Sequence, residues 1–94
     1  MFIHIGDNIS ILKKDVILIL DKKTLIKSKT SRLFIQNLIQ SGSLINHNDE
    51  DSVKTYIVAR DKSKRNRRRA KDDFKLYTSN ISSRSLFNRE KTNV

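Results

Sequence analysis

The sequence contains no cysteine, no proline and no tryptophan, and it has only two glycines among its 94 residues. The absence of cysteine excludes a disulfide framework, a zinc site with thiolate ligands and a catalytic thiol. The longest apolar run is the stretch VILIL (16–20), far short of the roughly 18 residues that a membrane span requires. The N-terminal residues lack the basic flank and apolar core of a signal peptide. These absences predict a cytoplasmic protein without a membrane span.

Acidic residues are scarce, since ten of them face twenty Lys and Arg residues and leave a net charge of +10. The excess is concentrated in the stretch RDKSKRNRRRAKDD, residues 60–73. Within residues 60–71, eight basic residues face a single Asp, which gives +7 and leaves +3 for the rest of the chain. Concentrated like charge repels itself unless a partner relieves it. This stretch is therefore predicted to meet a polyanion.

The basic stretch supplies most of the residues predicted to contact phosphate groups, namely Lys64, Arg65, Arg67, Arg68, Arg69 and Lys71. Four arginines within five residues exceed what solubility requires, because Lys or Glu would serve that purpose. The alternative interpretation is a solvated loop without a partner. We call residues 62–71 the basic arm. In either case Asp72 and Asp73 can pair with this arm and hold its base.

Alternating apolar residues predict several short strands, at residues 2–5, 9–11, 16–20, 44–45, 53–59 and 74–78. The basic stretch lies between the last two and is expected to form the tip of a long β-hairpin. Residues 16–20 are apolar at every position, so we expect a helix to cover one face and a neighbour or another subunit the other. Lys13, Lys14 and Asp15 interrupt the strand pattern and predict an exposed bend.

Residues 28–41 carry the best helical pattern, with an apolar stripe and Gly42 at the position of a left-handed C-terminal cap. Ser28, Thr30 and Ser31 are the candidate N-caps. A short final helix is expected after Ser82 and Ser83, packed through Leu86 and Phe87.

These elements predict an α+β fold. We expect a small, mostly antiparallel sheet of about five to six short strands, with one main helix and a short C-terminal helix packed on it. We expect residues 1–90 to form a single domain with a basic insertion at about 62–73, and residues 91–94 to form a flexible tail. A chain of this length buries only a modest fraction of its surface when it folds. We therefore expect self-association to add to its stability.

Other candidate sites are weaker. His4 lies on a strand face and is interpreted as a core or interface residue, and His47 belongs to the polar turn NHNDEDS, whose spacing fits no metal motif. Lys22, Lys23, Lys27, Lys29 and Arg32 form a second basic cluster, interpreted as solvated surface. No nucleophile–base pattern, Gly-rich phosphate loop or carboxylate pair is present. We therefore expect no enzyme activity, cofactor, metal or small-molecule substrate.

Five segments resemble the small bacterial RemB proteins, relatives of the extracellular-matrix regulator RemA. They are MFIHIGDN (1–8), DVILILD (15–21), FIQNLIQSG (34–42), KTYIVARD (54–61) and KLYTSNISSRSLFNRE (75–90). The most specific are the opening HIG and the closing Ile81-Ser82-Ser83, followed by Leu86 and a basic residue. The chain departs from the pattern at 62–73, where the family usually has a short turn.

The resemblance implies a DNA-binding regulator of biofilm-matrix genes that assembles into a homo-oligomer, with a ring as the arrangement found in RemA-like proteins. It also implies a DNA-contacting basic residue at the bend after the second strand, which falls on Lys14, beside Lys13. Double-stranded DNA is thus the expected partner. The residues leave two alternatives open: an RNA-binding module that uses the arginine-rich loop, and a non-enzymatic ring scaffold for protein partners.

Overall fold

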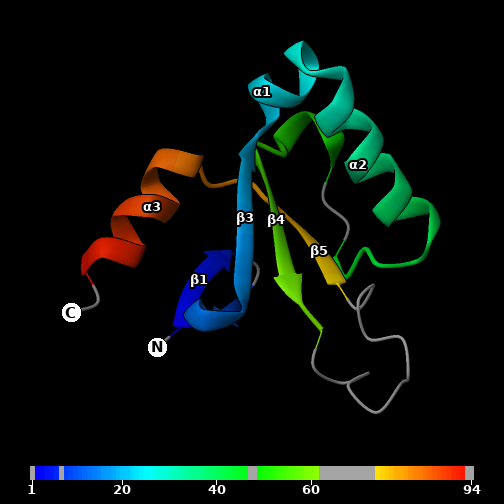
Figure 1. The fold of residues 1–94 in the computed structure, drawn as a ribbon. Coiled ribbons are helices and arrows are strands. Elements are labelled where there is room, and N and C mark those ends of the chain that lie inside the picture. Colours follow the sequence, from blue (N-terminus) through cyan, green and yellow to red (C-terminus); the bar gives the residue numbers. More distant parts are fainter. Residues whose placement is uncertain (1, 7, 47–48, 62–73, 93–94) are drawn as a thin grey trace.

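The computed structural model describes residues 2–6, 8–46, 49–61 and 74–92 (Figure 1). Its elements are, in chain order, β1 (Phe2–Gly6), β2 (Ile9–Leu12), the 3-10 turn η1 (Lys13–Asp15), β3 (Val16–Asp21), α1 (Lys22–Lys27), α2 (Lys29–Gln40), the 3-10 turn η2 (Glu50–Ser52), β4 (Thr55–Arg60), β5 (Phe74–Ser79) and α3 (Ser83–Thr92). The predicted α+β class and antiparallel pairing are confirmed. None of the helices in the described ranges is long and apolar enough to cross a membrane.

The strands form two sheets, not the single sheet that was predicted. β1 and β2 pair as a hairpin, and β3, β4 and β5 form a three-stranded sheet in the order β3-β4-β5. Ile3, Ile5 and Ile11 of the hairpin pack against residues of the larger sheet and do not extend it edge to edge. Packing the apolar face of the hairpin onto the sheet removes more apolar surface from water than edge pairing would.

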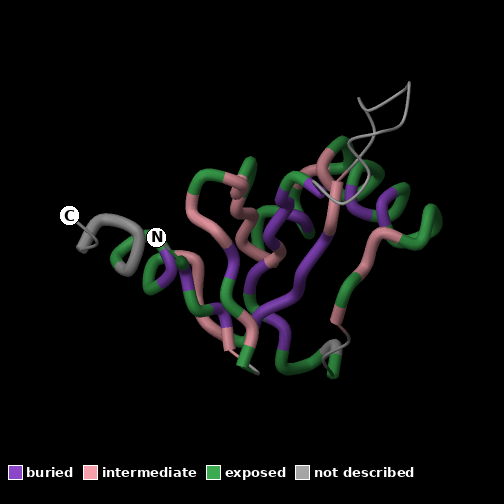
Figure 2. The backbone as a smooth tube through the Cα atoms, turned by 90° about the horizontal axis from the view of Figure 1, so that it is seen from below, coloured by how far each residue is buried: buried purple, intermediate pink, exposed green. Residues whose placement is uncertain are grey.

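The three-stranded sheet is covered on both faces, and each face has its own core. Ile57, Ala59 and Tyr77 face the β1–β2 hairpin and Leu86 of α3. Val58 and Leu76 face α1 and α2, where they meet Leu25, Ile35 and Leu38. Figure 2 shows the buried segments gathered in the middle of the molecule. Successive side chains of β4 and β5 thus pack into two different cores, one on each face of the sheet. These strands are therefore buried almost throughout.

Helix α2 begins and ends where its caps predict. The Ser28 hydroxyl accepts a hydrogen bond from the Ser31 amide at 3.3 Å, so Ser28 is the N-cap among the three candidates. Gly42 has a φ of +82°, and the amides of Gly42 and Ser43 donate to the carbonyls of Ile39 and Leu38. These two bonds are the Schellman arrangement, which needs a residue in the left-handed region.

Helix α1 was not predicted, because six residues are too few for a helical period to be visible in KKTLIK. A tertiary contact completes it. Nη1 of Arg32, in α2, donates to the carbonyls of Leu25 and Ile26 at 3.1 and 2.6 Å. Both carbonyls lie in the last turn of α1, where a helix leaves carbonyls without helical partners. The Leu25 carbonyl also accepts a hydrogen bond from the Ser28 amide at 3.3 Å. The helix therefore depends on its neighbour for its C-terminal end.

Helix α3 begins after Ser82, whose hydroxyl accepts from the Ser85 amide at 3.3 Å. Ser82 is thus the cap, and Ser83 is the first helical residue. Leu86 is fully buried, as predicted, but the packing role predicted for Phe87 is wrong, because its side chain is 46 % exposed. A short helix on a sheet has one buried face, and the next residue along the chain points about 100° away from it.

The two edges of the larger sheet differ. Residues 43–46 lie along β5: the Leu76 amide donates to Ser43 and the Ile45 amide to Leu76, both at 2.9 Å. The strand predicted at 44–45 is thus reduced to one parallel bridge, from Leu44 to Leu76. β3 forms the other edge, and no strand in the described ranges pairs with its outer side.

Residues 16–20 are only partly covered within the single chain, so their predicted cover by another subunit stays a prediction. Ile17 is 45 % exposed and Leu18 38 %. Ile17 stands at a register shift between Val16 and Leu18, so the alternation of faces slips at this point. The chain thus leaves two large apolar side chains at a sheet edge partly open to solvent.

Candidate nucleic-acid interface

The basic stretch connects two strands that are paired along their whole length. β4 and β5 are in antiparallel register from Thr55–Ser79 to Arg60–Phe74. The hairpin expected from the alternating pattern is therefore confirmed up to its last pair. The predicted phosphate contacts Lys64, Arg65, Arg67, Arg68, Arg69 and Lys71 lie within 62–73, outside the described residues, as do Asp72 and Asp73.

An ion pair stands at the base of this hairpin. Oδ1 of Asp61 lies 3.8 Å from Nζ of Lys75, and the Asp61 side chain is 9 % exposed. Arg60, one residue earlier, is exposed at the last strand pair. Asp61 is thus turned inward, and Arg60 adds positive charge at the outer surface.

The other predicted contact site lies in η1. Lys14 is exposed, whereas Lys13 is half-buried and has a partner within the protein. The bend predicted at Lys13–Asp15 is confirmed as a 3-10 turn. Val16, which follows the turn, pairs with Ala59 near the end of β4.

The strand register brings the two basic regions to the same end of the sheet. Val16 lies beside Ala59, and Arg60 lies beside Phe74, so η1 and both ends of the basic arm share one end (Figure 1, lower end of β3 and β4). Neighbouring strands are about 4.8 Å apart, so β3 and β5 are separated by about 10 Å across β4. Lys14 and Arg60, which are 46 positions apart in the sequence, thus lie at the same end of the sheet.

The opposite end of the sheet carries other basic residues. Asp21, Thr55 and Ser79 form its last row of pairs. Lys22 and Lys23 follow Asp21 directly, and Lys54 precedes Thr55. The sequence predicted only that Lys22 and Lys23 belong to a solvated cluster. Lys54 was overlooked, because strand pairing alone brings it beside these two lysines.

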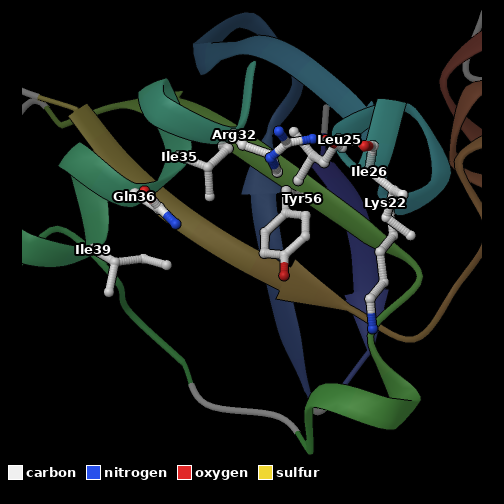
Figure 3. Close-up of a pocket in the computed structure, with 8 residues that line it drawn as sticks. All are labelled: Lys22, Leu25, Ile26, Arg32, Ile35, Gln36, Ile39 and Tyr56. Carbon is white, nitrogen blue, oxygen red and sulfur yellow. Dashed lines mark hydrogen bonds between the residues drawn. The ribbon is translucent and has the colours of Figure 1, made fainter. Parts of the chain in front are cut away.

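A hollow of about 270 Å³ lies between α1, α2 and β4 (Figure 3). Tyr56 rises from β4 in its centre, with Ile35, Gln36 and Ile39 of α2 on one side and residues of α1 on the other. The Arg32 guanidinium at its rim is already engaged with the carbonyls of α1. The Arg32 guanidinium therefore serves helix packing.

The remaining candidates from the sequence are placed as follows. His4 is exposed on β1 and has a partner within the protein, so it is not a core residue, and its alternative assignment to an interface stays a prediction. His47 lies outside the described residues. Within the described ranges, no three His, Asp or Glu side chains gather closely enough to hold a metal ion.

Comparison with known proteins agrees with the features above. No curated protein matches the sequence closely enough to be named as a relative. The family model of RemA-like proteins, described as extracellular matrix regulatory protein A-like, matches residues 2–89. This match spans both sheets, α1, α2 and the start of α3. The chain therefore belongs to the RemA-like family of extracellular matrix regulatory proteins.

Proposed function

We propose that this protein is a cytoplasmic, homo-oligomeric DNA-binding regulator that acts on the transcription of extracellular-matrix, or biofilm, genes. It is a RemB-like member of its family, and it acts by binding and not by catalysis. It contacts the phosphate backbone of double-stranded DNA through its basic loops. The contacts assigned to DNA are Lys13, Lys14, Lys64, Arg65, Arg67, Arg68, Arg69 and Lys71.

The observation that carries this proposal is the common end of the sheet shared by η1 and the basic arm. Lys14 is exposed there, and Arg60 leads into the arm beside it. A phosphate backbone carries one negative charge per about 1.7 Å of duplex axis, so a cluster of neighbouring cations contacts several phosphates at once. Arginine suits this role, because its planar guanidinium binds phosphate in two-pronged fashion.

Self-association would repeat this basic end in every subunit. Contacts made after the first become intramolecular, so several weak sites give useful affinity. The outer edge of β3, with Ile17 and Leu18, supports such an interface, because apolar side chains on an unpaired strand favour pairing with another chain. Ile17 is only three residues from Lys14, so an interface at this edge would place the basic ends of two subunits near one another.

The test is duplex binding measured by fluorescence anisotropy between 50 and 300 mM salt, on protein whose mass in solution is determined by light scattering. We expect an oligomer, and a log–log plot of affinity against salt with a slope of about −0.9 for each phosphate neutralised. A variant with Arg65, Arg67, Arg68 and Arg69 changed to Glu should lose binding. The matched control changes the exposed residues Lys23, Lys27, Lys29 and Lys54 to Glu, so that the same change in charge is made far from the arm. A strictly monomeric protein that ignores duplex DNA at 50 mM salt would refute the proposal.

A competition assay and a test of the variant in cells separate the two alternatives. Arginine-rich segments also fold on structured RNA, so an RNA hairpin is added as competitor. Displacement of DNA by equimolar RNA would favour the RNA-binding module. A variant that loses all nucleic-acid binding and still fulfils its cellular role would favour the scaffold.

A further inference from the structure

A hollow of about 530 Å³ lies at the end of the sheet opposite the basic arm. Four basic side chains line it, Lys22 and Lys23 from α1, Lys54 before β4 and Arg84 from α3, together with Asp21, Ser82 and Ser83. The four cations come from three segments that are distant in the sequence. With Asp21 as its one acidic lining residue, the hollow carries a net charge of +3.

Hydrogen bonds fix the three segments in place. The Lys22 amide donates to the Lys54 carbonyl at 2.9 Å, and the Lys54 amide donates to the Ser79 carbonyl at 2.8 Å. The fully buried Thr55 hydroxyl donates to the Ile81 carbonyl at 2.7 Å, directly before α3. The start of α1, the start of β4 and the start of α3 are thus joined through backbone groups, so the hollow has preformed walls.

Three of the four cations of this hollow are not neutralised by another described residue. Among the described residues, no salt bridge is recorded for Lys23, Lys54 or Arg84, and neither α1 nor α3 has an acidic residue in its first turn. The Asp21 side chain makes no cap hydrogen bond to α1. Cations clustered in this way attract a multiply charged anion.

The chemistry of the lining indicates a phosphorylated ligand. Lys and Arg side chains make charge-assisted hydrogen bonds to phosphate oxygens, and Arg84 can do so with two nitrogens at once. Ser83 presents a hydroxyl at the start of α3, a helix of ten residues whose positive end adds to the attraction. These groups act together with the lysines of the other two segments.

The rest of the lining indicates a small molecule more than a polymer. The volume lies within the roughly 300–1,000 Å³ of small-molecule sites. Ile26 and Val53 supply apolar surface, and the Asp21 carboxylate can accept hydrogen bonds from sugar hydroxyls. A bare phosphate backbone needs neither feature. We infer that this hollow binds an organic phosphate of nucleotide size, as an effector site distinct from the basic arm.

The inference goes beyond the proposed function and does not depend on it. Residues 16 and 21 bound β3, and five steps of about 3.3 Å put roughly 17 Å between the two ends of the sheet. A ligand in the hollow would therefore leave Lys14 and the base of the arm uncovered. The hollow at Tyr56 is a weaker candidate, because the Arg32 guanidinium there is already bound to α1.

The experiment is isothermal titration calorimetry on the full chain at 50 mM salt, with ADP, inorganic pyrophosphate and adenosine as separate probes. The test variant is Lys54→Gln with Arg84→Gln. Its control is Lys27→Gln with Lys29→Gln, which removes the same charge from exposed side chains outside the hollow. We expect saturable ADP binding with one site per chain, at least tenfold weaker in the test variant and within twofold of the original in the control. Adenosine should bind at least tenfold more weakly than ADP.

Three results would overturn the inference. One is the absence of saturable binding by both ADP and pyrophosphate to the unmodified protein, a result that no folding defect in a variant can cause. Another is an equal loss in the control variant, which would mean that net charge alone governs binding. The third is a loss of duplex-DNA affinity in the test variant without any nucleotide binding, which would make the hollow a nucleic-acid contact. The variant with Arg65, Arg67, Arg68 and Arg69 changed to Glu should lose DNA binding and retain ADP binding. This result would support two separate sites.

Discussion

Oδ1 of Asp61 and Nζ of Lys75 lie 3.8 Å apart at the point where the β4–β5 hairpin leaves the sheet. The pair links the last residue described before the basic arm to the second residue of β5. A largely buried carboxylate without a nearby cation is costly, so this ion pair helps to hold the two ends of the arm together.

Lys75→Met should therefore destabilise the protein by about 1 kcal/mol, because it leaves the Asp61 carboxylate without this cation while keeping the apolar stem. The cost stays below that of breaking a fully buried pair, since the Lys75 side chain is 32 % exposed. Urea denaturation followed by circular dichroism measures the change. Lys27→Met, at an exposed position of α1, should change the free energy of unfolding by less than about 0.5 kcal/mol. Equal effects of the two substitutions would contradict a structural role for the pair.

Leu86 and Phe87 are adjacent in α3 and should respond very differently to truncation. Leu86→Ala should cost about 3 kcal/mol, because the fully buried side chain packs in the core with Ile3, Ile57 and Tyr77. Phe87→Ala should cost less than about 1 kcal/mol in the single chain, because its side chain is almost half exposed. Thermal unfolding of the two variants checks the difference. A larger loss for Phe87→Ala would indicate that this side chain is covered in solution.

Gly42→Ala should destabilise the end of α2 by about 1 kcal/mol through backbone strain alone. The φ of +82° is unfavourable for alanine, whereas a Cβ at this position would meet no atom within 4 Å. Gly42→Asn should cost less than Gly42→Ala, because asparagine tolerates the left-handed region. Chemical denaturation of both variants gives the order, and a larger cost for asparagine would be evidence against this explanation.

Lys14→Ala should weaken duplex binding and reduce the magnitude of the salt slope by about 0.9, the value for one lost phosphate contact. Its side chain is exposed in η1, so folding should be unaffected. Lys27→Ala removes the same charge elsewhere and should leave the slope unchanged. Anisotropy titrations at several salt concentrations supply both slopes. Identical slopes for Lys14→Ala and the unmodified protein would exclude Lys14 from the contact.

Ile17→Asp should reduce the mass of the protein in solution, because it places a charge at the outer edge of β3. The single chain tolerates the change, since the side chain is already 45 % exposed. Leu33→Asp is the matched control: Leu33 is similarly exposed, but it lies on the outer side of α2. Light scattering distinguishes the variants. An unchanged mass for Ile17→Asp would place the subunit interface at another surface.

Local features were predictable where a few neighbouring residues decide the structure. The cap at Ser28, the left-handed Gly42 and the cap at Ser82 follow from side-chain and backbone preferences within one turn. The fully buried Leu86 and the hairpin strands around 62–73 were also found, because apolar spacing records which face is covered.

Features that depend on contacts between distant segments were not predictable in this way. α1 is too short to show a period, and it is completed by Arg32 of the next helix. Phe87 was assigned to the core because residue type alone does not reveal the direction of a side chain on a short helix. The exposure of Ile17 in the single chain was not predictable, because a register shift is set by the partner strand.

The sequence by itself determined the α+β class, the concentration of positive charge in residues 60–71 and the position of Lys13 and Lys14 at a bend, because composition and local periodicity are properties of the chain. Only the tertiary structure decided that the strands divide into two sheets and that the bend lies at the same end as the arm. It also decided that Lys54 and Arg84 join the lysines of α1 around one hollow. Strand register and face packing bring these residues together, and both are set by apolar burial between segments far apart in the chain.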